Sequence, residues 1–247
     1  SRIYNVDETG INTVGEPEII LAEKGQKITG TVATGERGKT VTVICAMSAS
    51  DNFIPPMFIF PRKRLSLLLT KDGPIDAIYH VSNNEWINEE LFIVWLAHFK
   101  KIVKPSPEDP VLLILDNNTS HITYESYSFC KDNGIVMVSI PPHTSHRLQP
   151  LDVTFFGPLK TALKVECNLF IKSNALLRIT HYDLASLFNK AYSTVATVNK
   201  GVSGFSTAGI FPINPNVFTN EDFLAAELLH LKRIDQIKVQ HFLPVHP

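Results

Sequence analysis

Three aspartates stand where carboxylates from distant parts of the chain could share one site: Asp7, Asp116 and Asp152. Asp116 follows the uninterrupted apolar run 111–115, which is typical of a strand buried on both faces of a sheet. Open α/β sheets bind their ligands at the carboxyl ends of such strands. Taken alone, Asp116 could equally well turn the chain or cap the next helix, because Asp favours both roles.

The sequence around the other two acids favours a shared site. Asp7 lies near the end of a short predicted strand at 3–10, and Asp152 follows the Pro-rich segment 141–150 and opens a stretch with helical spacing. Asp116 and Asp152 are 36 positions apart (152 − 116), which leaves room for a helix, a strand and a loop. We therefore expect two neighbouring strand ends and one helix to present the three acids to one point.

Clustered carboxylates suit phosphodiester chemistry when divalent cations are present. The charges of crowded carboxylates raise one another's pKa, so such a site binds cations readily. Hard cations such as Mg²⁺ and Mn²⁺ select oxygen ligands, and two ions about 3.5–4 Å apart can activate a nucleophile and stabilise the leaving oxygen. Carboxylates alone would repel the phosphate, so the predicted chemistry requires metal ions.

Four motifs in the sequence carry a resemblance to a known family. They are Asn5-Val6-Asp7-Glu8-Thr9-Gly10, Leu115-Asp116-Asn117 through His121, Gln149-Pro150-Leu151-Asp152, and Gly204-Phe205-Ser206-Thr207-Ala208-Gly209-Ile210-Phe211-Pro212-Ile213-Asn214-Pro215. In this order they resemble the signatures of a DDE-type transposase catalytic domain, in particular the pogo/Tigger/jerky branch related to the mariner group. That branch has Asp as its third acid, as here, and the motifs cover nearly the whole chain.

The resemblance implies an α/β fold, a ribonuclease H-like mixed sheet flanked by helices. It also implies a function, the metal-dependent hydrolysis of DNA at transposon ends followed by attack of the freed 3′-hydroxyl on target DNA. Asp7, Asp116 and Asp152 would be the catalytic and metal-binding residues, with two divalent ions, Mg²⁺ or Mn²⁺, as cofactors. The expected partner is DNA, on which the protein could form a homo-oligomer. The expected location is the nucleus, and a membrane is not an expected partner.

Four further side chains are candidates for a supporting role or for substrate contact: Glu8, Asn117, His121 and Gln149. Asn117 and His121 could orient the ligands or touch the substrate, although turn formation and helix capping explain them equally well. Glu8 should point to the opposite face of the strand from Asp7, which favours a supporting or outward position. Gln149 could position the loop that carries Asp152.

The composition describes an ordinary globular protein of 247 residues, with 44% hydrophobic and 19% charged residues. No window approaches the ~18 consecutive apolar residues of a membrane span, and the first residues show no signal-peptide pattern. The net charge of −1 argues against a strongly DNA-binding module, but two divalent cations would change the sum to +3, mostly at one place. Basic clusters at 62–64, 100–104 and 160–164 are interpreted as solvated surface.

Other sequence signals do not favour a second kind of site. Cys45, Cys130 and Cys167 are too widely spaced for a zinc motif or a disulfide framework, so we expect free thiols in a reducing, intracellular compartment. Segment 33–40 is a near miss to a phosphate-binding loop, but it leads into a strand pattern where that loop requires a helix. His143 and His146 lack a partner at zinc-ligand spacing.

Hydrophobic periodicity predicts strands at 3–10, 39–49, 54–60, 111–115 and 135–140, and helices at 88–103, 123–132, 152–170, 180–198 and 219–238. Segment 62–85 is expected to be a loop. Pro158 is expected to kink the third helix or mark its true start, and Gly201 to end the fourth. Residues 1–170 are predicted to form the ribonuclease H-like catalytic core, and residues 171–247 a C-terminal helical extension of the same domain.

Two alternatives to an active transposase remain at this point. A domesticated relative could bind DNA or chromatin partners without cutting, and intact acids do not decide against it. A different ribonuclease H-like nuclease is the other alternative, which the motif at 204–215 disfavours. The first predicted strand begins almost at residue 1, so we expect a part of a longer protein, whose relatives carry helix-turn-helix DNA-binding domains before this region.

Overall fold

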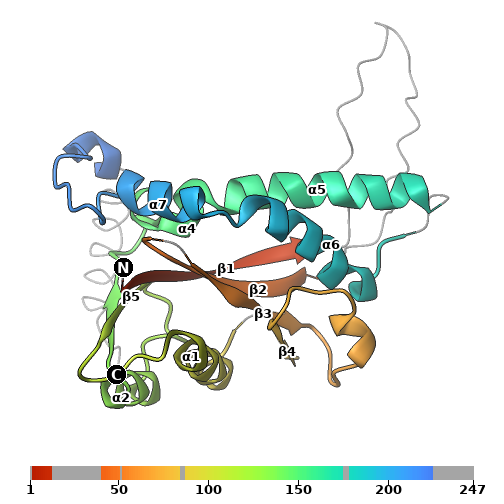
Figure 1. The fold of residues 1–247 in the computed structure, drawn as a ribbon, viewed down its shortest axis with the longest axis horizontal. Helices are drawn as coiled ribbons and strands as arrows, with labels where there is room; N and C mark the ends of the chain where they lie inside the picture. The colour runs from red at the N-terminus through yellow and green to blue at the C-terminus, as the bar shows by residue number, and fades with distance from the viewer. Residues whose placement is uncertain (1, 13–39, 51, 84–86, 175–177, 225–247) are drawn as a thin grey trace, which may run out of the picture.

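A six-stranded mixed sheet forms the centre of the structure, a computed structural model that describes residues 2–12, 40–50, 52–83, 87–174 and 178–224 (Figure 1). The strands lie in the order β4-β3-β2-β1-β5-β6. Their bounds are β1 (Ile3–Asn12), β2 (Thr40–Ser48), β3 (Phe53–Phe60), β4 (Ile78–Val81), β5 (Val111–Leu115) and β6 (Ile135–Ser139). Strands β1, β2 and β3 are antiparallel neighbours, whereas β5 runs parallel to β1, β6 to β5 and β4 to β3.

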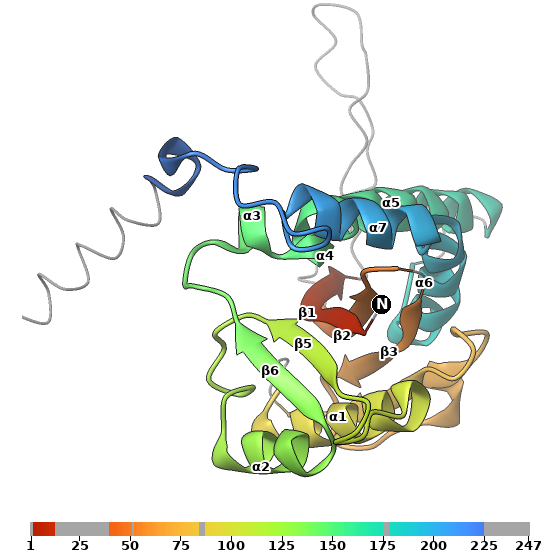
Figure 2. The same ribbon diagram turned by 60° about the vertical axis from the view of Figure 1, so that its left-hand side comes forward.

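Helices cover both faces of this sheet, as Figures 1 and 2 show. One face carries α1 (Glu89–Val103) and α2 (Tyr124–Asp132). The other carries α4 (Pro150–Thr154), α5 (Phe156–Ser173), α6 (His181–Val195) and α7 (Val198–Thr207). The short helices α3 (Ser145–Leu148), η1 (Leu67–Thr70) and η2 (Asn220–Phe223) complete the described elements. Three antiparallel strands, β1 to β3, are extended beside β1 by the parallel strands β5 and β6. The predicted ribonuclease H-like mixed sheet is therefore confirmed.

Each face of the sheet has its own hydrophobic core, because successive strand residues point to opposite sides. Tyr4 and Val6 pack with Trp95 and Phe99 of α1 on one side. Cys45 packs on the other side, in the core shared with α5 and α6. Burying a side chain of this size stabilises the fold by about 1.5–3 kcal/mol, so the two cores hold the sheet as a rigid support. In the described part of the chain, no helix is long and apolar enough to cross a membrane.

Local signals explain where the predicted helices begin and end. The side chains of Asn88 and Thr123 cap α1 and α2 by accepting hydrogen bonds from Leu91 N and Ser126 N. Gly134, with a φ of +68°, ends the turn between α2 and β6. The predicted helices at 88–103 and 123–132 and the strands at 111–115 and 135–140 are therefore confirmed, to within a residue or so at their ends.

The structure departs from the sequence predictions in several elements. Segment 62–85 is expected to be a loop but contains η1 and β4. The four residues of β4 are all partly exposed, so buried and exposed side chains do not alternate along it. Strand β1 continues to Asn12, because it pairs with β2 beyond the end of β5, so Asp7 lies in mid-strand. Gly201 does not end a helix but lies within α7. Pro158 is the third residue of α5, where a helix amide has no intrahelical partner to lose.

The predicted boundary between residues 170 and 171 falls inside α5. Leu184 and Phe188 of α6 belong to the same core cluster as the sheet residues Val43 and Phe58. The division into a catalytic core and a helical extension stays a prediction. Of the last predicted helix, only η2 is described, and the remainder of 219–238 lies outside the described residues, as does most of the segment 33–40.

Candidate active site

Asp7 and Asp116 come from neighbouring parallel strands. In the register of β1 and β5, Asn5 lies opposite Ile114. Continuing that register by two residues brings Asp7 alongside Asp116, which follows the last residue of β5 directly. Asp7 also lies opposite Cys45 of β2, so its carboxyl is in a largely apolar environment on this face of the sheet. The structure thus brings two of the three predicted acids together.

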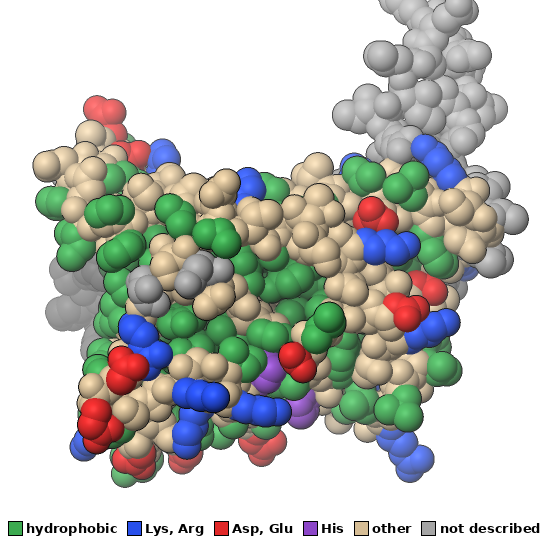
Figure 3. All heavy atoms as spheres, viewed as in Figure 1, with side chains coloured by type: hydrophobic (Ala, Val, Ile, Leu, Met, Phe, Trp, Pro, Cys, Tyr) green, Lys and Arg blue, Asp and Glu red, His purple; other side chains and the backbone are tan. Residues whose placement is uncertain are grey.

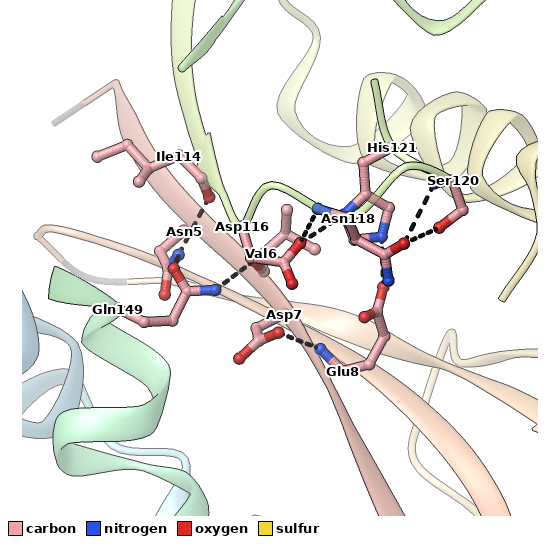
Figure 4. Close-up of polar contacts among 10 residues, drawn as sticks. All are labelled: Asn5, Val6, Asp7, Glu8, Ile114, Asp116, Asn118, Ser120, His121 and Gln149. Carbon is pink, nitrogen blue, oxygen red and sulfur yellow. Dashed lines mark hydrogen bonds and ion pairs between the residues drawn. The ribbon is translucent and has the colours of Figure 1, made fainter. Parts of the chain in front are cut away.

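A buried pair of amide side chains ties the third acid to these strands (Figure 4). Asn5 and Gln149 are both fully buried, with 0% exposure. Asn5 Nδ2 donates to the carbonyl of Ile114 and to Gln149 Oε1, both at 3.0 Å. Gln149 Nε2 donates to the carbonyl of Val6 at 3.2 Å, and Asn5 Oδ1 accepts from the backbone N–H of Leu151 at 3.0 Å. This Asn5–Gln149 clamp fixes the start of α4, on which Asp152 lies.

Helix α7 holds α4 from the other side. A Cβ atom added at Gly204 would lie 2.8 Å from Thr154 Oγ1 and 2.7 Å from Met47 Cε, so the close approach of α7 to α4 requires glycine. Thr154 Oγ1 also donates a hydrogen bond to the carbonyl of Lys200 at 3.2 Å. The sequence motif at 204–215 thus begins with a residue that supports the helix of Asp152.

His121 bridges two carboxylates at the end of β5. Its Nδ1 lies 2.9 Å from Asp116 Oδ1, and its Nε2 lies 2.7 Å from Glu8 Oε1. The imidazole is 1% exposed, and its ring lies 4.4 Å from the ring of Phe92 on α1. Although burial lowers the pKa of His121, the hydrogen bonds to Asp116 and Glu8 raise it to about 9. His121 is therefore an imidazolium that donates to both acids at neutral pH.

The turn after β5 is organised around Asp116 and Asn118. Asn118 N donates to Asp116 Oδ1 at 3.1 Å, and Asn118 Oδ1 accepts from Ser120 N at 3.2 Å. Burial raises the pKa of Asp116, but the hydrogen bond from His121, its charge and the Asn118 N–H together lower it below its usual range. Asn117, one of the candidate residues, is exposed on this turn. Asp116 is thus held as an oriented carboxylate.

The pKa values of the remaining two acids, Asp7 and Asp152, are raised. Burial, followed by the charges of Asp152 and Glu8, raises the pKa of Asp7 to about 8, and the charge of Asp116 adds to this. The hydrogen bond from Glu8 N to Asp7 Oδ1, at 2.8 Å, offsets only part of the effect. Partial burial and Asp116 raise the pKa of Asp152, against the lowering effect of Lys160. The three predicted acids therefore share one electrostatic environment.

The donor chemistry of this environment fits a hard divalent cation. Its carboxylate oxygens are the ligands that Mg²⁺ and Mn²⁺ select, and a cation would relieve the mutual repulsion that Asp7 experiences. Thr9 lies on the same face of β1 as Asp7, and its buried Oγ1 has no hydrogen-bond partner among the described residues. In the described ranges, however, no group of three His, Cys, Asp or Glu side chains is arranged so as to hold a metal ion.

Sequence reasoning found most of these residues but missed two. Asn5 and Asn118 were not among the candidate residues, although both lie within the motifs quoted above. Their hydrogen bonds join segments up to 146 residues apart or close a local turn, and residue type alone does not reveal such partners. Glu8 does point away from Asp7, as the alternation of strand residues predicts, yet it reaches Asp116 through His121 (Figure 4).

Comparison with known families bears on this arrangement of acids. The family model described as DDE superfamily endonuclease matches residues 37–184, which is more than half of the chain. The chain belongs to this family. The matched range of the DDE domain includes Asp116, His121, Gln149 and Asp152, whereas Asp7 precedes it.

Curated relatives match most of this DDE domain, but the match covers only a small part of each relative. It is similar to the MFS-type transporter clz9 of Cochliobolus lunatus, with 32% identity over 219 residues, 87% of this chain and 24% of that protein. It is also similar to the pogo transposable element with KRAB domain of Mus musculus, with 23% identity over 182 residues, 73% of this chain and 30% of that protein. With the family model, the pogo relatives confirm a transposase-like DDE domain of the predicted branch. The chain spans less than a third of the length of these relatives.

Solved structures of low sequence identity are similar to the DDE domain over much of its length. One is the Mos1 strand transfer complex, with 16% identity, a TM-score of 0.48, and coverage of 82% of this chain and 54% of that chain. Another is the Mos1 mariner paired end complex with Mn, with 14% identity, a TM-score of 0.48, and coverage of 86% of this chain and 55% of that chain.

Proposed function

We propose that this chain is the catalytic domain of a DNA transposase that acts in the nucleus. The reaction is the hydrolysis of a phosphodiester at a transposon end, followed by attack of the freed 3′-hydroxyl on target DNA. In the first step, water forms a bond to phosphorus, the bond from phosphorus to the 3′-oxygen breaks, and a proton passes to that oxygen. In the second, the 3′-hydroxyl attacks a target phosphorus, loses its proton and displaces another 3′-oxygen.

Asp7, Asp116 and Asp152 would hold two divalent ions, Mg²⁺ or Mn²⁺. When bound, such ions supply charge that activates the attacking oxygen and stabilises the leaving one. Asp116 is held ready for this role, because His121 keeps it ionised and oriented. Asp7 gives up a proton more readily once positive charge replaces the repulsion from its neighbours.

One observation carries the proposal, the convergence of three motifs that lie far apart in the sequence. Continued two residues beyond the Asn5–Ile114 pair, the parallel register of β1 and β5 supports a position of Asp7 beside Asp116. The Asn5–Gln149 clamp then holds the start of α4, and with it Asp152, against the same two strands. The family match adds an endonuclease domain to this geometry. A shared cation site between two strands and a helix is what metal-assisted DNA cleavage requires.

The test is a nicking assay with this chain, supercoiled plasmid DNA and Mg²⁺ or Mn²⁺. We expect the wild type to nick the plasmid in the presence of either ion and not in EDTA. Asp116→Asn should reduce nicking by at least about 10²-fold, because the neutral amide removes a metal ligand without changing the shape of the side chain. The matched control is Asp132→Asn, which neutralises an exposed aspartate at the end of α2.

Equal nicking by the wild type and Asp116→Asn would reject the assignment of the site. DNA binding by the wild type without nicking, in either metal, would instead favour a domesticated protein that binds DNA but no longer cuts. A DNA-binding module fused to the chain supplies affinity for the DNA sequence of that module. If the fusion protein binds this DNA and still does not nick it, weak binding is excluded as the reason for the missing cleavage.

A further inference from the structure

An arginine on the short helix before α4 forms an ion pair with an acid from the end of the described chain. Arg147 lies on α3, five positions before Asp152 (152 − 147). Its Nη2 lies 2.9 Å from Asp222 Oδ1, on η2. The adjacent His146 lies near enough for its charge to contribute to the low pKa of Asp222, after the larger effect of Thr219. Figure 2 shows η2 returning to the side of α3.

Arg147 is fixed in position relative to the acids. Thr144 is buried, and its Oγ1 donates to the carbonyl of Pro141 at 2.7 Å. Arg147 N donates to the Thr144 carbonyl at 2.9 Å, and Gln149 N donates to the Ser145 carbonyl at 3.0 Å. Since Gln149 belongs to the buried clamp, α3 and the start of α4 are held as one unit. The backbone that carries Arg147 thus has a defined place relative to α4, the helix of Asp152.

Asp222 is equally well prepared to fill this place. Its Oδ2 accepts hydrogen bonds from Thr219 N at 2.9 Å and from Thr219 Oγ1 at 3.1 Å, which leaves Oδ1 for Arg147. The ion pair is open to solvent, since the side chain of Arg147 is 48% exposed and that of Asp222 is 22% exposed. Exposed ion pairs contribute little to stability, so another anion can replace Asp222 at small cost.

We propose that Arg147 binds a backbone phosphate of the DNA strand that enters the acid site, and that Asp222 occupies this subsite in the free protein. The inference rests on the proposed function, because it assumes that DNA reaches Asp152. A guanidinium binds phosphate and carboxylate oxygens with the same pair of N–H donors. The DNA phosphate therefore displaces the Asp222 carboxylate when the strand binds.

The charge distribution explains why one arginine matters here. Three carboxylates repel an incoming phosphodiester, and a nearby fixed cation offsets that repulsion. On the face drawn in Figure 3, Lys and Arg side chains are interspersed with Asp and Glu, and they do not form a continuous basic surface. Where basic side chains do not form a continuous surface, the loss of a single phosphate-binding cation has a measurable effect on DNA binding.

The experiment measures binding of a fluorescent 30-base-pair DNA duplex to this chain in EDTA, at several salt concentrations. Arg147→Ala should weaken binding roughly tenfold and reduce the slope of log K against log salt by about 1, the effect of one lost phosphate contact. Asp222→Asn should tighten binding, by up to roughly the same factor, because the subsite is then free. In the double variant, the Asp222 substitution should have no further effect.

Opposite signs for the two single variants separate this proposal from a purely structural ion pair. If the pair only stabilises η2, both variants lower the melting temperature equally, and neither of them tightens DNA binding. That result overturns the proposal. Arg64→Ala is the charge-matched control, since Arg64 is exposed and lies in the segment before η1. An equal loss in Arg64→Ala also overturns it. No binding by the wild type rejects the proposed function itself, and this inference with it.

Discussion

At the scale of single residues, the site depends on His121, which neutralises two acids that would otherwise repel each other. Glu8 and Asp116 come from different strands, and both accept hydrogen bonds from the same imidazolium. The ring is buried against Phe92, so it cannot turn away to solvent. Breaking such a buried pair by removing one partner leaves charge without compensation, which is strongly destabilising.

His121→Gln tests this role through the pH dependence of stability. The folded pKa of His121, about 9, lies above its unfolded value of 6.5, so its contribution is fully present below pH 6.5 and is lost as the pH rises through 9. We expect the variant to lower the free energy of unfolding by roughly 3 kcal/mol at pH 6 and by much less at pH 10. Urea denaturation at both pH values measures the difference.

His98→Gln is the control for that measurement. Burial lowers the pKa of His98, so its contribution should not decrease above pH 7. A difference between the wild type and His121→Gln that stays constant from pH 6 to pH 10 would show that His121 is neutral in the folded protein.

At the scale of elements, the position of α4 depends on α7, the last α-helix of the described chain. The glycines of α7 allow its backbone to approach both α4 and β2, and an added Cβ at Gly201 would lie 2.8 Å from the Ser48 carbonyl. Because α4 carries Asp152 and is only five residues long, its own hydrogen bonds do not fix its direction. Packing against α7 and the buried clamp provide that direction.

Gly204→Ala should disturb this packing. The new methyl group would clash with Thr154 and Met47, and we expect a loss of stability of about 1–3 kcal/mol together with weaker nicking. Gly157→Ala is the matched control, because nothing apart from its chain neighbours lies within 4 Å of a Cβ at that helical position. There alanine should change the stability by less than about 1 kcal/mol, because the proline that follows disfavours helical backbone at residue 157 and offsets the helix preference of alanine. Thermal unfolding of both variants measures the effect, and equal changes would contradict the role assigned to α7.

The same elements show how far sequence reasoning reaches. Apolar runs and capping residues predicted β5, α1 and α2, because burial and local hydrogen bonds leave a pattern in the sequence itself. Gly201 was interpreted as a helix end, since a glycine needed for close packing looks the same in sequence as one that ends a helix. The motifs predict a site of Asp7, Asp116 and Asp152 and a positioning role for Gln149, but they do not reveal Asn5 as its partner, because nothing local links Asn5 to Gln149.

At the scale of the whole molecule, the acid site joins the first strand, the middle of the chain and the helical region. Where no cation is bound, the burial of Asp7 and its repulsion by neighbouring acids are a source of instability that grows with pH. The pKa of Asp7 is raised from 3.8 to about 8, so folding becomes less favourable as the pH rises through that interval, by at most about 1.4 kcal/mol per pH unit. Divalent ions that compete with the proton should reverse this effect.

Addition of Mg²⁺ or Mn²⁺ should therefore stabilise the wild type more at pH 8 than at pH 5. We expect a rise in melting temperature of roughly 2–4 °C at pH 8 for each kcal/mol of binding free energy gained, given a chain of this length. Asp7→Asn should be more stable than the wild type at pH 8 without metal and should lose most of the response to metal. Differential scanning fluorimetry measures both, with Asp132→Asn as the control. An undiminished response in Asp7→Asn would exclude Asp7 as a metal ligand.

The Asn5–Gln149 clamp also limits which replacements the molecule can accept at residue 5. Both N–H groups of the Asn5 amide donate to carbonyl oxygens, and its oxygen receives a backbone N–H. Aspartate has the same shape, yet it would set a negative oxygen against two oxygens deep inside the protein. The substitution that looks mildest on paper would thus be among the most damaging, so a relative of this chain that changes residue 5 must also change what surrounds it.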